Sequence, residues 1–225
     1  MNLPKAVFFD WDGTLVESLN FLHMAHNHVR SHFGLTAYSF DEFKENMRFS
    51  SRQLYPVVYG DKADEAMDIL AQFMNDNHLK NIQLIDGAIE LLESLHKAGI
   101  PMGVVSNKRQ SFLTREIAHL GWGPYFKSVV GAGIAPRDKP EADPLVMALD
   151  QAGLKPGPEV LYIGDTETDL LCAGAAGCTV AFLYHAQSDN PLIQKYNPSY
   201  SAKNCRDLAL ALFPPPNSHK YKPEI

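Results

Sequence analysis

The sequence predicts an α/β protein: a doubly wound, Rossmann-like parallel sheet with an all-helical segment inserted near its beginning. Three observations predict this fold class. From Ile85 onward, short apolar runs alternate with amphipathic helical patterns. The apolar runs are continuous rather than alternating, which is typical of parallel strands buried on both faces. The interval between the first two apolar runs is also far longer than one strand–helix unit, which indicates an insertion.

Each strand of the core is a short apolar run that ends in polar or turn-forming residues. Glycines end the helical patterns between the runs, at Gly99, Gly121 and Gly153, as is common at helix C-termini. The helices therefore connect strands in the order that a parallel sheet requires. The predicted strands are residues 6–9, 100–105, 126–130, 160–163 and 179–183.

The interval between the first two strands holds about 90 residues, whereas a strand–helix–strand unit needs roughly 30. Its apolar side chains recur at helical spacing, and Ser39 with Glu42 forms a capping box that begins a short helix. We therefore predict a helical bundle over residues 17–84, inserted into an α/β core of residues 1–16 and 85–213. The proline-rich tail, residues 214–225, is expected to be loose.

Composition and charge restrict the kind of protein. The 26 acidic and 20 basic residues leave a formal charge of −6, which argues against a nucleic-acid partner bound by phosphate neutralisation. No apolar stretch reaches the roughly 20 residues of a membrane span, and no secretory signal is evident. The three cysteines have no metal-binding spacing. We expect a cytoplasmic protein without a membrane or nucleic-acid partner.

Polar side chains with catalytic potential follow four of the predicted strands. The carboxyl ends of parallel strands share one edge of the sheet, where ligands of such folds bind, so these side chains should converge. The candidates are Asp10, Asp12, Ser106, Asn107, Lys139, Asp165 and Asp169.

The electrostatics of such a cluster indicate a metal ion. Two carboxylates about 5 Å apart repel each other by roughly 3 kcal/mol at an effective dielectric constant near 20. A cation relieves that repulsion, and carboxylate oxygens suit Mg²⁺. A metal ion, a lysine and a hydroxyl group would together orient a phosphate, as phosphoryl transfer requires. One aspartate could then act as a nucleophile and the other as a general acid and base.

Four ordered motifs resemble those of the haloacid dehalogenase-like hydrolases, over essentially residues 6–212. They are FDWDGTL at 9–15, SN at 106–107, KP at 139–140 and GDTETD at 164–169. The VVSNK run at 104–108 is similar to the phosphoglycolate phosphatase-like branch, whose movable cap the helical insertion resembles.

The resemblance implies a Mg²⁺-dependent phosphatase that hydrolyses a small phosphomonoester through an aspartyl-phosphate. Asp10 would be the nucleophile. Asp12 would be the general acid and base, with its backbone carbonyl on the metal. Further roles are implied for the remaining residues. Ser106, Asn107 and Lys139 would hold the phosphoryl group, and Asp165 with Asp169 would complete the Mg²⁺ site.

Some features depart from the family pattern or leave alternatives open. Asp138 stands where a small residue is common, which adds a negative charge beside Lys139. The loop from Arg48 to Arg52 could contact an anionic substrate or simply be solvated. A phosphosugar mutase of the same family and a receiver-like signalling module are alternative functions. We expect a small phosphorylated metabolite as partner and make no prediction of the oligomeric state.

Overall fold

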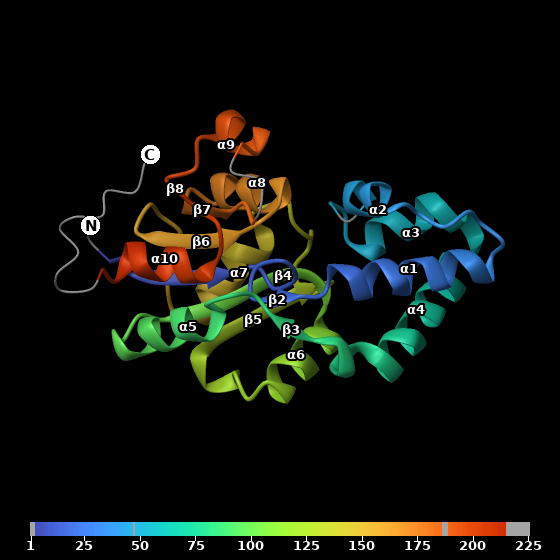
Figure 1. Ribbon diagram of the computed structural model, residues 1–225, viewed down its shortest axis with the longest axis horizontal. Helices are drawn as coiled ribbons and strands as arrows, with labels where there is room; N and C mark the ends of the chain where they lie inside the picture. The colour runs from blue at the N-terminus through green and yellow to red at the C-terminus, as the bar shows by residue number, and fades with distance from the viewer. Residues whose placement is uncertain (1–2, 47, 186–188, 215–225) are drawn as a thin grey trace.

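A computed structural model describes residues 3–46, 48–185 and 189–214 (Figure 1). Six strands form one sheet in the order β5–β4–β1–β6–β7–β8, and every neighbouring pair is parallel. The chain winds outward from β1 in both directions, so the predicted doubly wound α/β fold is confirmed. The strands are β1 (Ala6–Phe9), β4 (Met102–Arg109), β5 (Phe126–Ala132), β6 (Val160–Gly164), β7 (Thr179–Leu183) and β8 (Tyr200–Ala202).

All five predicted strands form, and three of them have different bounds: β5 and β6 continue to Ala132 and Gly164, and β4 is shifted. The strand expected at residues 100–105 is β4, which begins at Met102 and continues to Arg109. Ser106 and Asn107, expected directly after this strand, lie within its last part, where the pairing with β5 is irregular between Val105 and Arg109. The edge strand β8 was not predicted, because three residues are too few to show a periodic pattern.

Helices cover both faces of the sheet. On one face, Val7 and Phe9 of β1 belong to the same buried cluster as side chains of α5 (Ala88–Lys97), α6 (Gln110–His119) and α10 (Cys205–Leu212). On the other face, Ala6 and Phe8 pack with α7 (Asp143–Gln151) and α8 (Glu167–Ala175). The short elements η3 (Gly123–Tyr125) and α9 (Pro191–Tyr196) lie in connections. A strand that is apolar at every position is thereby buried on both faces.

The inserted segment is a helical bundle with its own core, and it lies at one end of the molecule beside the sheet (Figure 1). It packs Phe21, Val29, Phe43, Tyr55 and Leu70 together. The predicted capping box forms, since the backbone N–H of Ser39 donates to Glu42 at 2.8 Å. The elements are α1 (Leu19–His32), α2 (Phe40–Asn46), α3 (Ser51–Tyr59), η1 (Gly60–Lys62), α4 (Ala63–Asn77) and η2 (His78–Asn81).

Two short strands connect the helical bundle to the sheet. β2 (Val16–Glu17) pairs antiparallel with β3 (Gln83–Leu84), so the chain leaves and re-enters the sheet at one place. The predicted boundaries at residues 17 and 84 lie in this ribbon, and we propose it as the division between core and cap. Apart from Pro214, the predicted loose tail lies outside the described residues.

The described helices include none with the length and apolar character that a membrane crossing needs. Cys172, Cys178 and Cys205 are all free thiols.

Candidate active site

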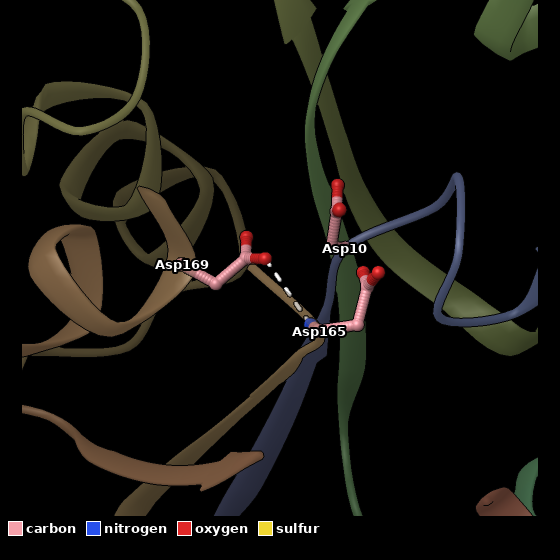
Figure 2. Close-up of side chains that lie close together, drawn as sticks. All are labelled: Asp10, Asp165 and Asp169. Carbon is pink, nitrogen blue, oxygen red and sulfur yellow. Dashed lines mark hydrogen bonds between the residues drawn. The ribbon is translucent and has the colours of Figure 1, made fainter. Parts of the chain in front are cut away.

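Three carboxylates converge where β1 and β6 end. Oxygen atoms of Asp10, Asp165 and Asp169 all lie within 4.8 Å of one another (Figure 2). Lys139, from the segment after β5, places its Nζ 2.8 Å from Oδ1 of Asp10 and 2.7 Å from Oδ1 of Asp169. Because β1 and β6 are adjacent parallel strands, their carboxyl ends bring the first and last motifs together.

Burial gives this cluster an unusual charge balance. Burial raises the pKa of Asp10 to about 8, despite the neighbouring Lys139 ammonium, and the carboxylates of Asp169 and Asp165 raise it further. Burial also raises the pKa of Asp165 above its ordinary value. For Lys139, burial alone would lower the pKa, but the charges of Asp10 and Asp169 outweigh it and raise the pKa. Lys139 contacts two of the three carboxylates, whereas Asp165 lies 3.8 Å from Nε2 of His185 and accepts from the Thr14 hydroxyl. Because three acids are grouped here, a further cation would be stabilised.

Asp169 is the most fully hydrogen-bonded of the three carboxylates. Its Oδ1 accepts from Lys139 Nζ at 2.7 Å and from the Tyr162 hydroxyl at 3.2 Å. Its Oδ2 accepts from the backbone N–H groups of Asp165 and Thr166 and from the Thr166 hydroxyl, at 3.2, 3.0 and 2.6 Å. These donors contact both oxygens, so Asp169 orients Lys139 and the 165–166 turn.

Two motif glycines allow the carboxylates to approach the backbone. Gly13 has a φ of +85°, and a Cβ there would lie 2.4 Å from Oδ2 of Asp165. At Gly164, a Cβ would lie 2.4 Å from Cβ of Asp169. Any larger residue would displace a carboxylate, which explains physically why glycine is needed at both places.

Asp12 lies outside the group of three carboxylates and is held by different partners. Its Oδ1 accepts from the hydroxyl of Ser18 and from Nζ of Lys108, the latter at 2.8 Å. Lys108 also lies 2.9 Å from Oε2 of Glu116. The side chain of Asp12 lines the cavity described below, so it faces the space where a substrate would lie.

Glu116 joins Lys108 to two further donors, and sequence reasoning missed this network. The indole N–H of Trp11 donates to Oε2 of Glu116 at 2.7 Å, and Nδ1 of His78 lies 3.0 Å from Oε1. Burial would raise the pKa of Glu116, but the bonds from His78 and Lys108 lower it. A signal was present in the sequence: Glu116 lies among Phe112, Leu113 and Ile117 on the apolar side of α6, where an acid needs a buried partner.

Ser106 and Asn107 lie at the same edge, as predicted, but their contacts differ. The buried hydroxyl of Ser106 accepts from the backbone N–H of Lys108 at 3.2 Å, and Ser106 lines the cavity. The Asn107 amide donates to the backbone carbonyl of Lys139 and accepts from its backbone N–H, both at 3.1 Å. Asn107 therefore fixes the backbone of Lys139 relative to β4.

A cavity of about 930 Å³ lies between the core and the helical bundle. Asp10, Asp12, Ser106 and Lys139 line its core side, and side chains of α1, α3 and α4 line the opposite side. The inserted bundle thus supplies the outer wall of the site, and a ligand of ordinary metabolite size fits this volume.

The carboxylate of Asp138, the residue before Lys139, contacts the helical bundle. Its Oδ2 accepts from the Ser50 hydroxyl at 2.7 Å and lies 3.4 Å from a guanidinium nitrogen of Arg52. Its Oδ1 accepts from the backbone N–H of Gly133 at 2.8 Å. The loop from Arg48 to Arg52 therefore forms part of the contact between bundle and core.

We predict that Asp138→Ala lowers the free energy of unfolding by about 1–3 kcal/mol, because the buried hydroxyl of Ser50 and the backbone N–H of Gly133 both lose this acceptor. Denaturant melts followed by circular dichroism would measure the loss. Asp41→Ala removes an exposed acid paired with Lys44 and should shift the midpoint far less. Equal shifts in the two variants would show that Asp138 does not tie the bundle to the core.

Comparisons with known proteins agree with this architecture. Residues 7–183 match the family model of the haloacid dehalogenase-like hydrolases. A phosphoglycolate phosphatase from Xanthomonas campestris is 31% identical over 85% of this chain and 90% of its own length. A pyrophosphatase, PpaX, from Bacillus velezensis is 26% identical over 90% of this chain and 94% of its own.

Solved structures share the fold over nearly the whole chain. A haloacid dehalogenase-like hydrolase from Streptococcus pneumoniae is 25% identical, with a TM-score of 0.78 over 94% of this chain and 98% of that one. A hydrolase from Pseudomonas syringae is 20% identical and shows the same fold, with a TM-score of 0.79 over 90% of this chain and 95% of its own.

Proposed function

Because the chain belongs to the haloacid dehalogenase-like hydrolases, we propose that it is a Mg²⁺-dependent phosphatase. It hydrolyses a small phosphomonoester through an aspartyl-phosphate, and it acts on a phosphorylated metabolite in the cytoplasm. The observation that carries the proposal is the contact of Lys139 with Asp10 beside Asp165. A nucleophilic carboxylate, an ammonium and a second carboxylate at one point suit phosphoryl transfer better than other hydrolytic chemistry.

The residues present fit a magnesium ion. Asp10 and Asp165 would hold it through carboxylate oxygens, with Asp169 beside them and the backbone carbonyl of Asp12 as a further ligand. Oxygen donors of this kind suit Mg²⁺. Burial, with a smaller contribution from the neighbouring carboxylates, raises the pKa of Asp10 and of Asp165, so a bound cation would be stabilised beside them. When bound, Mg²⁺ would offset the negative charge of the phosphoryl oxygens.

The side chains of the chain would carry out both halves of the reaction. An oxygen of the Asp10 carboxylate attacks phosphorus, the bond from phosphorus to the ester oxygen breaks, and Asp12 gives a proton to the departing alcohol. Asp12 then takes a proton from a water molecule whose oxygen attacks the same phosphorus, and this releases inorganic phosphate and Asp10. Lys139 would bind the phosphoryl oxygens and orient the group toward Asp10.

Removing the metal is expected to stop turnover without unfolding the protein. EDTA should lower the rate of phosphate release from a phosphomonoester by about 100-fold or more, since three buried carboxylates would then repel both one another and the substrate. Added Mg²⁺ should restore the rate, while circular dichroism stays constant. Full activity in EDTA would contradict the proposed cofactor.

The same assay separates the alternative functions. A phosphatase releases many phosphates per chain without an activator. A phosphosugar mutase would require a sugar bisphosphate, and a receiver-like module would retain one long-lived phosphate per chain.

A further inference from the structure

The helical bundle of residues 17–84, the proposed cap, forms one wall of the cavity, and this wall is mainly apolar. Six apolar side chains of α1 and α4 line it: Leu19, Leu22, Met67, Leu70, Ala71 and Met74. The helices present these residues at helical spacing, so the apolar wall runs along both helices. Leu22, Leu70 and Met74 are almost fully buried, and Met67 and Ala71 are half-buried beside them. The part of a substrate that extends from the phosphate toward the cap therefore meets hydrocarbon.

The polar groups on this wall do not favour a second anion. His26 and the Tyr55 hydroxyl are hydrogen-bonded to each other at 3.3 Å. Burial lowers the pKa of His26 to about 4, so this imidazole is neutral at physiological pH. Asp64 and Asp68, one turn apart on α4, add negative charge at the edge of the cavity.

Most of the cationic groups that line the cavity already contact carboxylates of the core. Among the described cap residues on this wall, Arg52 is the one cation, and its guanidinium lies 3.4 Å from Asp138. On the core side, Lys139 and Lys108 contact Asp10 and Asp12. Arg109, exposed at the end of β4, also lines the cavity, as do the exposed acids Asp64 and Asp68, so the exposed part of the lining holds charges of both signs.

We propose that the natural substrate is a phosphomonoester of an uncharged, largely apolar alcohol, and not of an alcohol with a second anionic group. This inference rests on the proposed phosphatase function and specifies its substrate class. The proposed substrate differs from the one in the names of several similar proteins, since phosphoglycolate has a carboxylate that a single methylene group separates from the ester oxygen. A carboxylate placed against the apolar side chains of α1 and α4 would lose water without gaining an ion pair from them. An alkyl or aryl group there would gain free energy by burial.

The test compares esters with the same kind of leaving group and different tails. Butyl phosphate, 3-phenylpropyl phosphate and 3-carboxypropyl phosphate are all esters of primary alcohols, so the chemistry at phosphorus is matched. With the Mg²⁺-loaded full-length enzyme, kcat/KM should be higher for butyl than for carboxypropyl phosphate by about 10-fold or more. The phenylpropyl ester should be better still, because each buried methylene group contributes about a factor of four.

Variants on the apolar wall make the test specific. Ala71→Arg places a cation on the wall and should raise the ratio of carboxypropyl to butyl activity by about 10-fold. Ala71→Met adds length without charge and should leave that ratio low. Gln72→Arg adds the same charge on α4 beside the wall, at a residue that does not line the cavity, and should change the ratio little.

The possible outcomes separate the inference from the function on which it rests. If wild-type enzyme hydrolyses all three esters but prefers the carboxypropyl ester, the inference is overturned and the phosphatase function stands. A marked preference for a cationic ester such as phosphocholine would overturn it in the same way. If no ester is hydrolysed with Mg²⁺ present, the phosphatase function fails, and the inference fails with it.

Discussion

Asp10→Asn is expected to lower the turnover of any phosphomonoester by about 1,000-fold or more, because an amide cannot form the covalent bond to phosphorus. The fold should persist. Burial raises the pKa of Asp10 to about 8, which means that its charge is poorly solvated and that a neutral side chain of the same shape is tolerated. Lys139 also keeps its contact with Asp169 in the variant. Phosphate release and thermal melts measure the two expectations.

Asp150→Asn serves as the matched control, since it removes an exposed acid of α7 by the same change of side chain. Its activity should equal that of the wild type. If Asp10→Asn keeps about a tenth of wild-type activity while folded, Asp10 is not the nucleophile.

Lys108→Met is expected to impair catalysis in a way that depends on the leaving group. Lys108 and Ser18 both donate to Oδ1 of Asp12, so they fix the carboxyl group that is proposed to protonate the departing alcohol. General acid catalysis contributes about 10²–10⁴-fold for a poor leaving group. The variant should therefore lose about 100-fold in kcat for an alkyl phosphate and considerably less for p-nitrophenyl phosphate, whose phenolate leaves without full protonation.

The ratio of kcat for the alkyl phosphate to kcat for p-nitrophenyl phosphate distinguishes this positioning role from damage to the fold. Misfolded protein would lower both rates equally, whereas a misplaced Asp12 lowers mainly the alkyl rate. Glu116→Gln, which keeps the shape of the side chain that holds Lys108, should shift the ratio in the same direction by a smaller factor. Lys80→Met, a change on the exposed surface, should leave it unchanged. Equal losses on both substrates in Lys108→Met would contradict the proposed role.

The sequence predicted the parts of the site that depend on strand order. Asp10 and Asp165 directly follow apolar runs, and parallel pairing of β1 with β6 necessarily brings such positions to one edge. The length of the first interval predicted the helical insertion in the same way. Both predictions depend on the order of the strands and the length of the segments between them, and both can be read from a single sequence.

The parts that the sequence did not predict depend on side-chain contacts between distant segments. The direction of the Asp12 carboxyl group is decided by Lys108, 96 positions away, and Asp138 is paired with Ser50, 88 positions away. The amide of Asn107 holds the backbone of Lys139, 32 positions away, a contact that the sequence did not indicate. No periodic pattern encodes these partners, since each depends on how the bundle and the helices pack on the sheet.

The most direct test of the central claim is to trap the phosphorylated enzyme. Enzyme with Mg²⁺ and a ³²P-labelled phosphomonoester would be quenched in acid within the first turnover, digested and mapped by mass spectrometry. The proposed mechanism predicts label on the peptide that contains Asp10, with a decay at least as fast as kcat, and none in Asp10→Asn. Turnover without any labelled peptide, or with label on another residue, would contradict it.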